Sequence, residues 1–164
     1  MSLFELAAET LRACRRSDAK LATAESCTGG LIAAALTEVP GSSDVVDRAF
    51  VTYSDDAKKQ MLGVKAATLN AHGAVSEAVA REMVLGALAK SKAKIAVSVT
   101  GIAGPGGGTA EKPVGLVFIA CAVRDGETHV ERKLWRHLEH SADRQRIRWL
   151  SARTALELVI DRLG

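Results

Sequence analysis

The segment from Lys20 to Leu36 reads KLATAESCTGGLIAAAL and decides the fold. Its first part, Lys20 to Ala24, is short and apolar, which predicts a buried strand. Its last part, Leu31 to Leu36, is apolar on all sides, which predicts a buried helix. Residues 25–30, ESCTGG, form a tight turn between the two. A strand that turns directly into a helix is a building unit of α/β proteins.

The remaining chain continues this alternation. Further strands are expected where apolar and β-branched residues cluster, at 45–53, 95–99, 114–123 and 128–134. Helices are expected after the capping residues Ser2, Asp55, Ser76 and Ser141, and loops at 70–73 and 100–113. Asp125-Gly126 predicts a hairpin turn, so the last two strands are expected to be antiparallel.

These elements together predict an α/β fold. We expect a three-layer α/β/α sandwich on a mixed sheet of about five strands with one antiparallel hairpin. The chain has 164 residues, of which 48% are hydrophobic and 25% charged. This composition fits one compact domain, which we place over residues 1–164.

Composition argues against several classes of protein. The longest apolar run, Leu116 to Val123, is too short to span a membrane, and the first residues lack the pattern of a secretory signal, so we expect a cytoplasmic protein without a membrane partner. The net charge of +3 is too balanced to indicate nucleic acid. Three scattered cysteines indicate neither a disulfide framework nor a metal site, and no cofactor is expected. The alternating segment 128–134 is an edge through which a homo-oligomer could form.

Ser26 is the first candidate for chemistry. Ligands of open α/β sheets gather where strands end and helices begin, which is where the turn at 25–30 lies. Gly29 and Gly30 allow close approach of the backbone, and amides at a helix start can stabilise an oxyanion or bind a phosphate. The alternative is that Ser26 and Thr28 only cap the helix.

A serine nucleophile needs a base, and Lys58 is the candidate. The four histidines, His72, His129, His137 and His140, show no pattern that suggests a triad. Lys58 falls in the first turn of the helix that Asp55 is expected to cap. There the helix dipole and the neighbouring Lys59 would both lower its pKa. The alternative is that both lysines are solvated surface charges.

The glycine-rich segment 100–113 lacks the Gly-Lys-Ser/Thr of a Walker motif, and no helix follows it as in a dinucleotide fingerprint. It follows the expected central strand, so it should face the same crevice as Ser26, with Thr100 at the tip of the strand. The alternative is a connection that only has to turn sharply.

Seven motifs follow one another along the chain: AESCTGG at 24–30, PGSS at 40–43, FVTYS at 50–54, AK at 57–58, HGAVS at 72–76, TGIAGP at 100–105 and KPVG at 112–115. Together they resemble the CinA carboxy-terminal domain family, whose enzymes are bacterial nicotinamide mononucleotide deamidases. The resemblance covers nearly the whole chain and is weakest in the first ~18 residues and beyond Leu134.

The resemblance implies hydrolysis of nicotinamide mononucleotide to nicotinic acid mononucleotide and ammonia, a salvage step toward NAD, by a Ser/Lys mechanism without a metal. It implies that Ser26 attacks, that Lys58 is the base and that the amides of Thr28, Gly29 and Gly30 stabilise the oxyanion. The further candidates are Ser43 as a rival nucleophile, Tyr53 to orient the amine or stack on the pyridine ring, and Thr100, Gly101, Gly104 and Arg144 to hold ribose or phosphate.

The sequence leaves two alternatives open, another nucleophile and a function without catalysis. Cys27 could be the nucleophile, because a thiolate is stabilised at a helix start. Alternatively, the chain could be a non-catalytic nucleotide-binding or sensing module that keeps the pocket without the chemistry.

Overall fold

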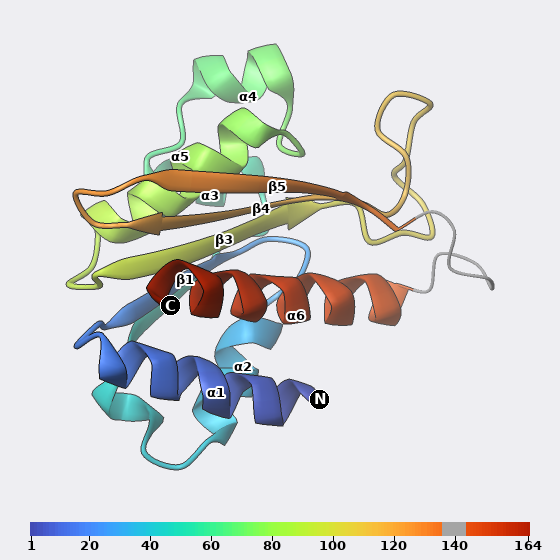
Figure 1. Cartoon of the computed structure of the whole chain (residues 1–164). Coiled ribbons are helices and arrows are strands. Elements are labelled where there is room, and N and C mark those ends of the chain that lie inside the picture. Colours follow the sequence, from blue (N-terminus) through green and yellow to red (C-terminus); the bar gives the residue numbers. More distant parts are fainter. Residues whose placement is uncertain (136–143) are drawn as a thin grey trace.

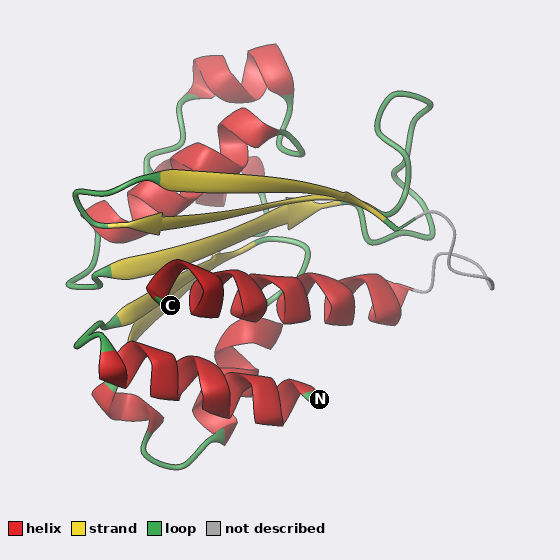
Figure 2. Ribbon diagram, viewed as in Figure 1, coloured by secondary structure: helices red, strands yellow, loops and turns green. Residues whose placement is uncertain are grey.

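The computed structural model describes residues 1–135 and 144–164 and shows three layers (Figure 1). A five-stranded sheet in the order β2-β1-β3-β4-β5 forms the middle layer. Its strands are β1 (Leu21–Glu25), β2 (Val46–Val51), β3 (Ile95–Gly101), β4 (Leu116–Val123) and β5 (Thr128–Leu134). One face is covered by α1 (Leu3–Arg16), α2 (Leu31–Glu38) and α6 (Arg144–Leu163), the other by α3 (Asp55–Leu62), α4 (Ala66–His72) and α5 (Glu77–Ala89). The predicted α/β/α sandwich is confirmed (Figure 2).

The sheet is mixed, as expected, and it contains a second antiparallel pairing besides the expected hairpin. β1 runs parallel to β2 and β3, whereas β4 is antiparallel to both β3 and β5. The physical reason is the connection between β3 and β4. A parallel neighbour requires a crossover, usually a helix, and the glycine-rich segment between these strands supplies none, so the chain returns antiparallel. The hairpin at Asp125-Gly126 is present.

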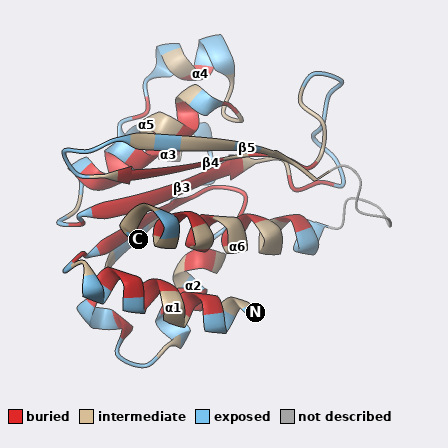
Figure 3. Ribbon diagram, in the orientation of Figure 1, coloured by how far each residue is buried: buried red, intermediate tan, exposed pale blue. Residues whose placement is uncertain are grey.

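Burial follows the layers (Figure 3). Every residue of β1 is buried, as is all of β3 except its last residue, Gly101, as expected for central strands. β2 is an edge strand and is partly exposed. The prediction that the helix after Gly30 is buried on all sides is wrong, because Ala34 is exposed on the outer side of α2. α5 is buried along one face, which includes Val79, Met83, Val84, Ala87 and Leu88.

The helix starts test the capping predictions. The capping box of Ser2 and Glu5 is present at α1, and Ser76 caps α5. Asp55 was expected to cap the third helix, but the cap of α3 is Ser54, whose hydroxyl accepts a hydrogen bond from the amide of Ala57. Asp55 is the first residue of the helix. Most of the expected loop at 70–73 belongs to α4. His137, His140 and the expected cap Ser141 lie outside the described residues.

The topology collects the candidate residues at one edge of the sheet. β1, β2 and β3 are parallel, so their carboxyl ends lie side by side. Ser26 follows β1, α3 with Lys58 follows β2, and Thr100 lies at the end of β3. No helix in the described part of the chain is long and apolar enough to cross a membrane.

Candidate active site

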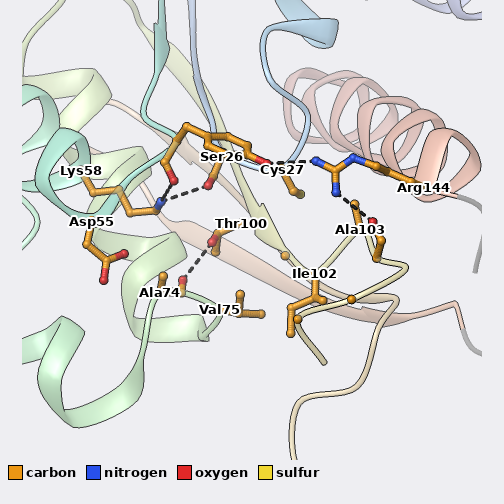
Figure 4. A pocket seen from close by; sticks show the side chains of 15 residues that line it. Ser26, Cys27, Asp55, Lys58, Ala74, Val75, Thr100, Ile102, Ala103 and Arg144 are labelled. Atoms are coloured by element: carbon orange, nitrogen blue, oxygen red, sulfur yellow. Dashed lines mark hydrogen bonds between the residues drawn. The ribbon is translucent and has the colours of Figure 1, made fainter. Parts of the chain in front are cut away.

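Ser26 and Lys58 are in direct contact. Nζ of Lys58 lies 3.0 Å from Oγ of Ser26 (Figure 4). It also donates to the carbonyl oxygens of Thr52 at 2.9 Å and Tyr53 at 3.2 Å. The two carbonyls can only accept, so they hold two N–H groups of the amine. The third position of the nitrogen points at Ser26. In the neutral amine this position is the lone pair, which can accept the serine proton.

Lys58 is buried in spite of its charge. Its side chain is 1% exposed. Burial lowers the pKa of Lys58 below the ordinary lysine value, while the nearby Asp55 and Cys27 act in the opposite direction. The expected help from Lys59 is not seen, because Lys59 forms an ion pair of 2.8 Å with Asp56. Desolvation is therefore the main cause of the shift toward a neutral base.

The turn after Ser26 is organised by Glu25. The side chain of Glu25 is fully buried, and its two carboxylate oxygens accept the amides of Ile32 at 2.9 Å and Ala33 at 3.0 Å. These amides belong to the first turn of α2, so Glu25 neutralises the positive end of that helix. The expectation that Ser26 and Thr28 might be the caps is wrong, since the N-cap is Gly30 and has no side-chain cap.

The amides of residues 28–30 are not brought to the pocket. The Gly29 amide donates to the carbonyl of Ser26, the helix-start amides are used by Glu25, and none of residues 28–30 lines the cavity. Gly29 and Gly30 adopt positive φ angles of 60° and 98°, which glycine allows, and thereby shape the turn that presents Ser26. Their role in this structure is conformational.

Arg148 of α6 fixes the same turn from the other side. It donates to the carbonyl of Cys27 at 3.1 Å and to that of Thr28 at 2.8 Å. The local sequence pattern does not single out Arg148 or the side chain of Glu25 as part of the site. The spacing of Arg144 and Arg148 was a usable signal, because residues four apart share one helix face.

The pocket beside Ser26 has a volume of about 260 Å³. Its walls are Ser26 and Cys27, the start of α3, residues 74–75, residues 100–104 with Gly106 and Gly107, and Arg144. The hydroxyl of Thr100 donates to the carbonyl of Ala74 at 2.9 Å and braces the two walls (Figure 4). The predicted residues Thr100, Gly101 and Gly104 therefore do lie in one cavity with Ser26 and Lys58.

Tyr53 and Arg144 meet at the rim of the pocket. Arg144 donates to the hydroxyl of Tyr53 at 3.0 Å and to the carbonyl of Gly104 at 2.9 Å. Tyr53 is 63% exposed. The part of Tyr53 that contacts the Lys58 amine is its carbonyl, not its hydroxyl. Arg144 thus joins the glycine-rich loop to the segment before α3.

Ser43 is not brought to this site. It lies in a short 3₁₀ turn, Ser42–Asp44, that precedes β2, whereas Lys58 follows β2. The two residues are therefore at opposite ends of the strand, and Ser43 does not line the pocket. This placement speaks against Ser43 as the partner of Lys58.

Cys27 lines the pocket but is a poor nucleophile. Its side chain is buried, and burial raises the pKa of Cys27 to about 12. The thiolate, which is the reactive form, is therefore disfavoured at neutral pH. Among the described residues there is also no group of three His, Cys, Asp or Glu side chains placed to hold a metal ion.

Fold and site together define an α/β protein with a serine–lysine pair that lines one pocket. The comparisons with known proteins identify the family to which this fold belongs. The model of the CinA C-terminal domain matches residues 3–163. The chain therefore belongs to the CinA C-terminal domain family.

Relatives of two lengths are found. The nicotinamide-nucleotide amidohydrolase PncC of Enterobacter agglomerans is 48% identical over 96% of this chain and 93% of its own length, and that of Escherichia coli K12 is 46% identical over 94% and 91%. A CinA-like protein of Akkermansia muciniphila is 51% identical over 89% of this chain, and the match spans only 34% of that relative. The chain thus corresponds to about a third of the longer relatives.

A solved structure has the same fold. The competence/damage inducible protein CihA of Agrobacterium tumefaciens superposes with a TM-score of 0.92 at 51% identity, over 97% of this chain and 94% of that one.

Proposed function

We propose that this protein hydrolyses the carboxamide of nicotinamide mononucleotide to nicotinic acid mononucleotide and ammonia. The observation that carries the proposal is the 3.0 Å contact between a buried lysine amine and a serine hydroxyl in the pocket. The names of the relatives of similar length, nicotinamide-nucleotide amidohydrolases, support the substrate class.

In the first half of the reaction, Oγ of Ser26 attacks the carboxamide carbon while its proton passes to Nζ of Lys58. The tetrahedral intermediate then collapses. Lys58 delivers the proton to the amide nitrogen, the C–N bond breaks and ammonia leaves. The carboxyl group is now an ester of Ser26. The carbonyls of Thr52 and Tyr53 keep the amine oriented throughout.

In the second half, water attacks the ester carbon and gives a proton to Lys58. Lys58 returns this proton to Oγ of Ser26 as the C–O bond to the serine breaks, and the carboxylic acid product ionises as it is released. The oxyanion of both intermediates needs a donor. The amide of Cys27, directly after the nucleophile and in the wall of the pocket, is the donor we propose.

The charged end of the nucleotide is assigned to the opposite side of the pocket. Arg144 supplies a guanidinium for the phosphate, and the backbone of Gly101 and Gly104 approaches the ribose and phosphate closely. The ring of Tyr53 stands at the rim, where it can stack on the pyridine.

The test is ammonia release by the purified protein from nicotinamide mononucleotide, compared with free nicotinamide and NAD. We expect turnover of the mononucleotide, and a loss of about 10²- to 10⁴-fold in kcat/KM for Lys58→Ala with a loss at least as large for Ser26→Ala. Ser43→Ala, with an exposed side chain outside the pocket, is the matched control and should keep normal activity.

Three results would contradict this proposal. Normal turnover by folded Ser26→Ala would show that Ser26 is not the nucleophile. Loss of activity on alkylation of Cys27 in the native protein, with Ser26→Ala active, would favour the thiol. Binding of the mononucleotide without ammonia release would identify a binding or sensing module.

A further inference from the structure

The pocket contains a second charged group near the reacting centre. Asp55, the first residue of α3, lines the same cavity as Ser26 and Lys58. Figure 4 shows Asp55 beside Lys58, with Arg144 on the other side of the pocket. The cavity therefore has a cation at one end and an anion at the other.

Asp55 is exposed and lies in the first turn of α3. Within the described residues it accepts no hydrogen bond and forms no ion pair, and it acts electrostatically on Lys58 and Lys59. Its neighbour Asp56 differs, because the Asp56 carboxylate pairs with Lys59 at 2.8 Å and does not line the cavity. Among the described residues, Asp55 is thus an exposed carboxylate without a hydrogen-bond partner, and it lines the pocket.

Deamidation changes the charge of the substrate group that lies near Asp55. The substrate carboxamide is neutral and has two N–H donors, which a carboxylate can accept. The product is a carboxylate, which has no proton to donate at neutral pH and carries the same charge as Asp55. At the distances found in one small pocket, such like charges repel, although solvent at the rim weakens the effect.

We propose that Asp55 makes the pocket select the neutral carboxamide over the carboxylate, so that it favours substrate binding and expels the product. This inference rests on the proposed function and adds a specificity residue to it. Arg144 holds the phosphate, which substrate and product share. Asp55 distinguishes the carboxamide of the substrate from the carboxylate of the product.

The test compares Asp55→Asn with Asp56→Asn, each combined with Ser26→Ala so that the substrate is bound without turnover. Calorimetry measures the affinity for nicotinamide mononucleotide and for nicotinic acid mononucleotide. We expect Asp55→Asn to bind the product about tenfold more tightly, the effect of one screened like-charge contact. Its affinity for the substrate should change less than threefold, roughly, since an Asn carbonyl still accepts an N–H. Asp56→Asn removes a charge from the same helix turn and should change neither affinity.

The sign of the change separates this role from an indirect one. If Asp55 acted only by favouring the ammonium form of Lys58, its removal would weaken binding of the anionic product. Unchanged or weaker product binding by folded Asp55→Asn, or an equal effect of Asp56→Asn, would overturn the inference. Ammonia release by the wild-type protein in the same preparation shows which proposal has failed. If the wild-type protein releases ammonia, only the role of Asp55 is disproved. If it releases none, the proposed function fails, and this inference fails with it.

Discussion

At the scale of the residue, the central feature is an amine that has lost most of its water. Lys58 is 1% exposed, and its nitrogen is surrounded by two carbonyl oxygens and one hydroxyl. Carbonyl dipoles stabilise an ammonium less well than bulk water or a carboxylate partner does, so burial lowers the pKa of Lys58. Below this pKa the nitrogen has no lone pair and cannot accept the proton of Ser26.

The pH dependence follows from this direction. On acidification through the lowered pKa of Lys58, the amine becomes protonated, and kcat/KM should fall about tenfold per pH unit once most of the enzyme is protonated. The measurement is the rate of ammonia release across the pH range, with circular dichroism at each pH to show that the protein stays folded. A rate that is flat from acid to alkaline pH would contradict a lysine base.

At the scale of the element, the turn between β1 and α2 depends on the buried carboxylate of Glu25. It caps two amides of α2, and the neighbouring backbone is held by a bond from the Thr52 amide to the Glu25 carbonyl at 2.8 Å. Arg148 holds the following two carbonyls. The turn that carries Ser26 is therefore held by contacts with α2, with Thr52 directly after β2 and with α6.

Glu25→Ala should lower the free energy of unfolding by about 3 kcal/mol, because the buried amide of Ile32 and the partly buried amide of Ala33 lose a charged acceptor. It should also lower kcat, since the turn that presents Ser26 loses its anchor. The control is Ser2→Ala, which removes a cap from α1, away from the pocket, and should cost about 1 kcal/mol without a change in kcat. Urea unfolding and ammonia release measure the two effects. A Glu25→Ala protein as stable as Ser2→Ala would show that the buried cap is not needed.

At the scale of the whole molecule, Lys58 is held in place by the packing of α3 on α5. Gly86 of α5 lies against the end of α3, where an added Cβ would be 2.0 Å from the carbonyl oxygen of Leu62. The two helices can approach this closely only because residue 86 has no side chain. Packing on one side of the sheet therefore sets where the amine of Lys58 reaches Ser26.

Gly86→Ala should force α3 and α5 apart. We expect a loss of about 1–3 kcal/mol in the free energy of unfolding, and a lower kcat because the Lys58 amine moves away from Ser26. Gly86 is not among the residues that line the pocket, so the substitution tests packing and not chemistry. Leu85→Ala, on the exposed side of the same helix, is the control and should change activity little. Normal stability and kcat in Gly86→Ala would disprove the coupling.

The sequence by itself determined the α/β class, the positions of most strands and the pairing of Ser26 and Lys58 as candidates. Local signals carry these features: runs of apolar residues, the capping box at Ser2, the Asp-Gly hairpin turn, and motifs close together along the chain. The family resemblance to CinA also depends only on such motifs, and the comparisons confirm it.

Only the tertiary structure decided which groups meet. It separated Ser43 from Lys58, gave the cap of α2 to Glu25 instead of Ser26 or Thr28, and placed Asp55 in the wall of the pocket. It also made β4 antiparallel to β3. The physical reason is that burial, desolvation and hydrogen-bond partners depend on segments far apart in the chain, such as α6 against the turn at 25–30, and local sequence patterns carry no record of these contacts.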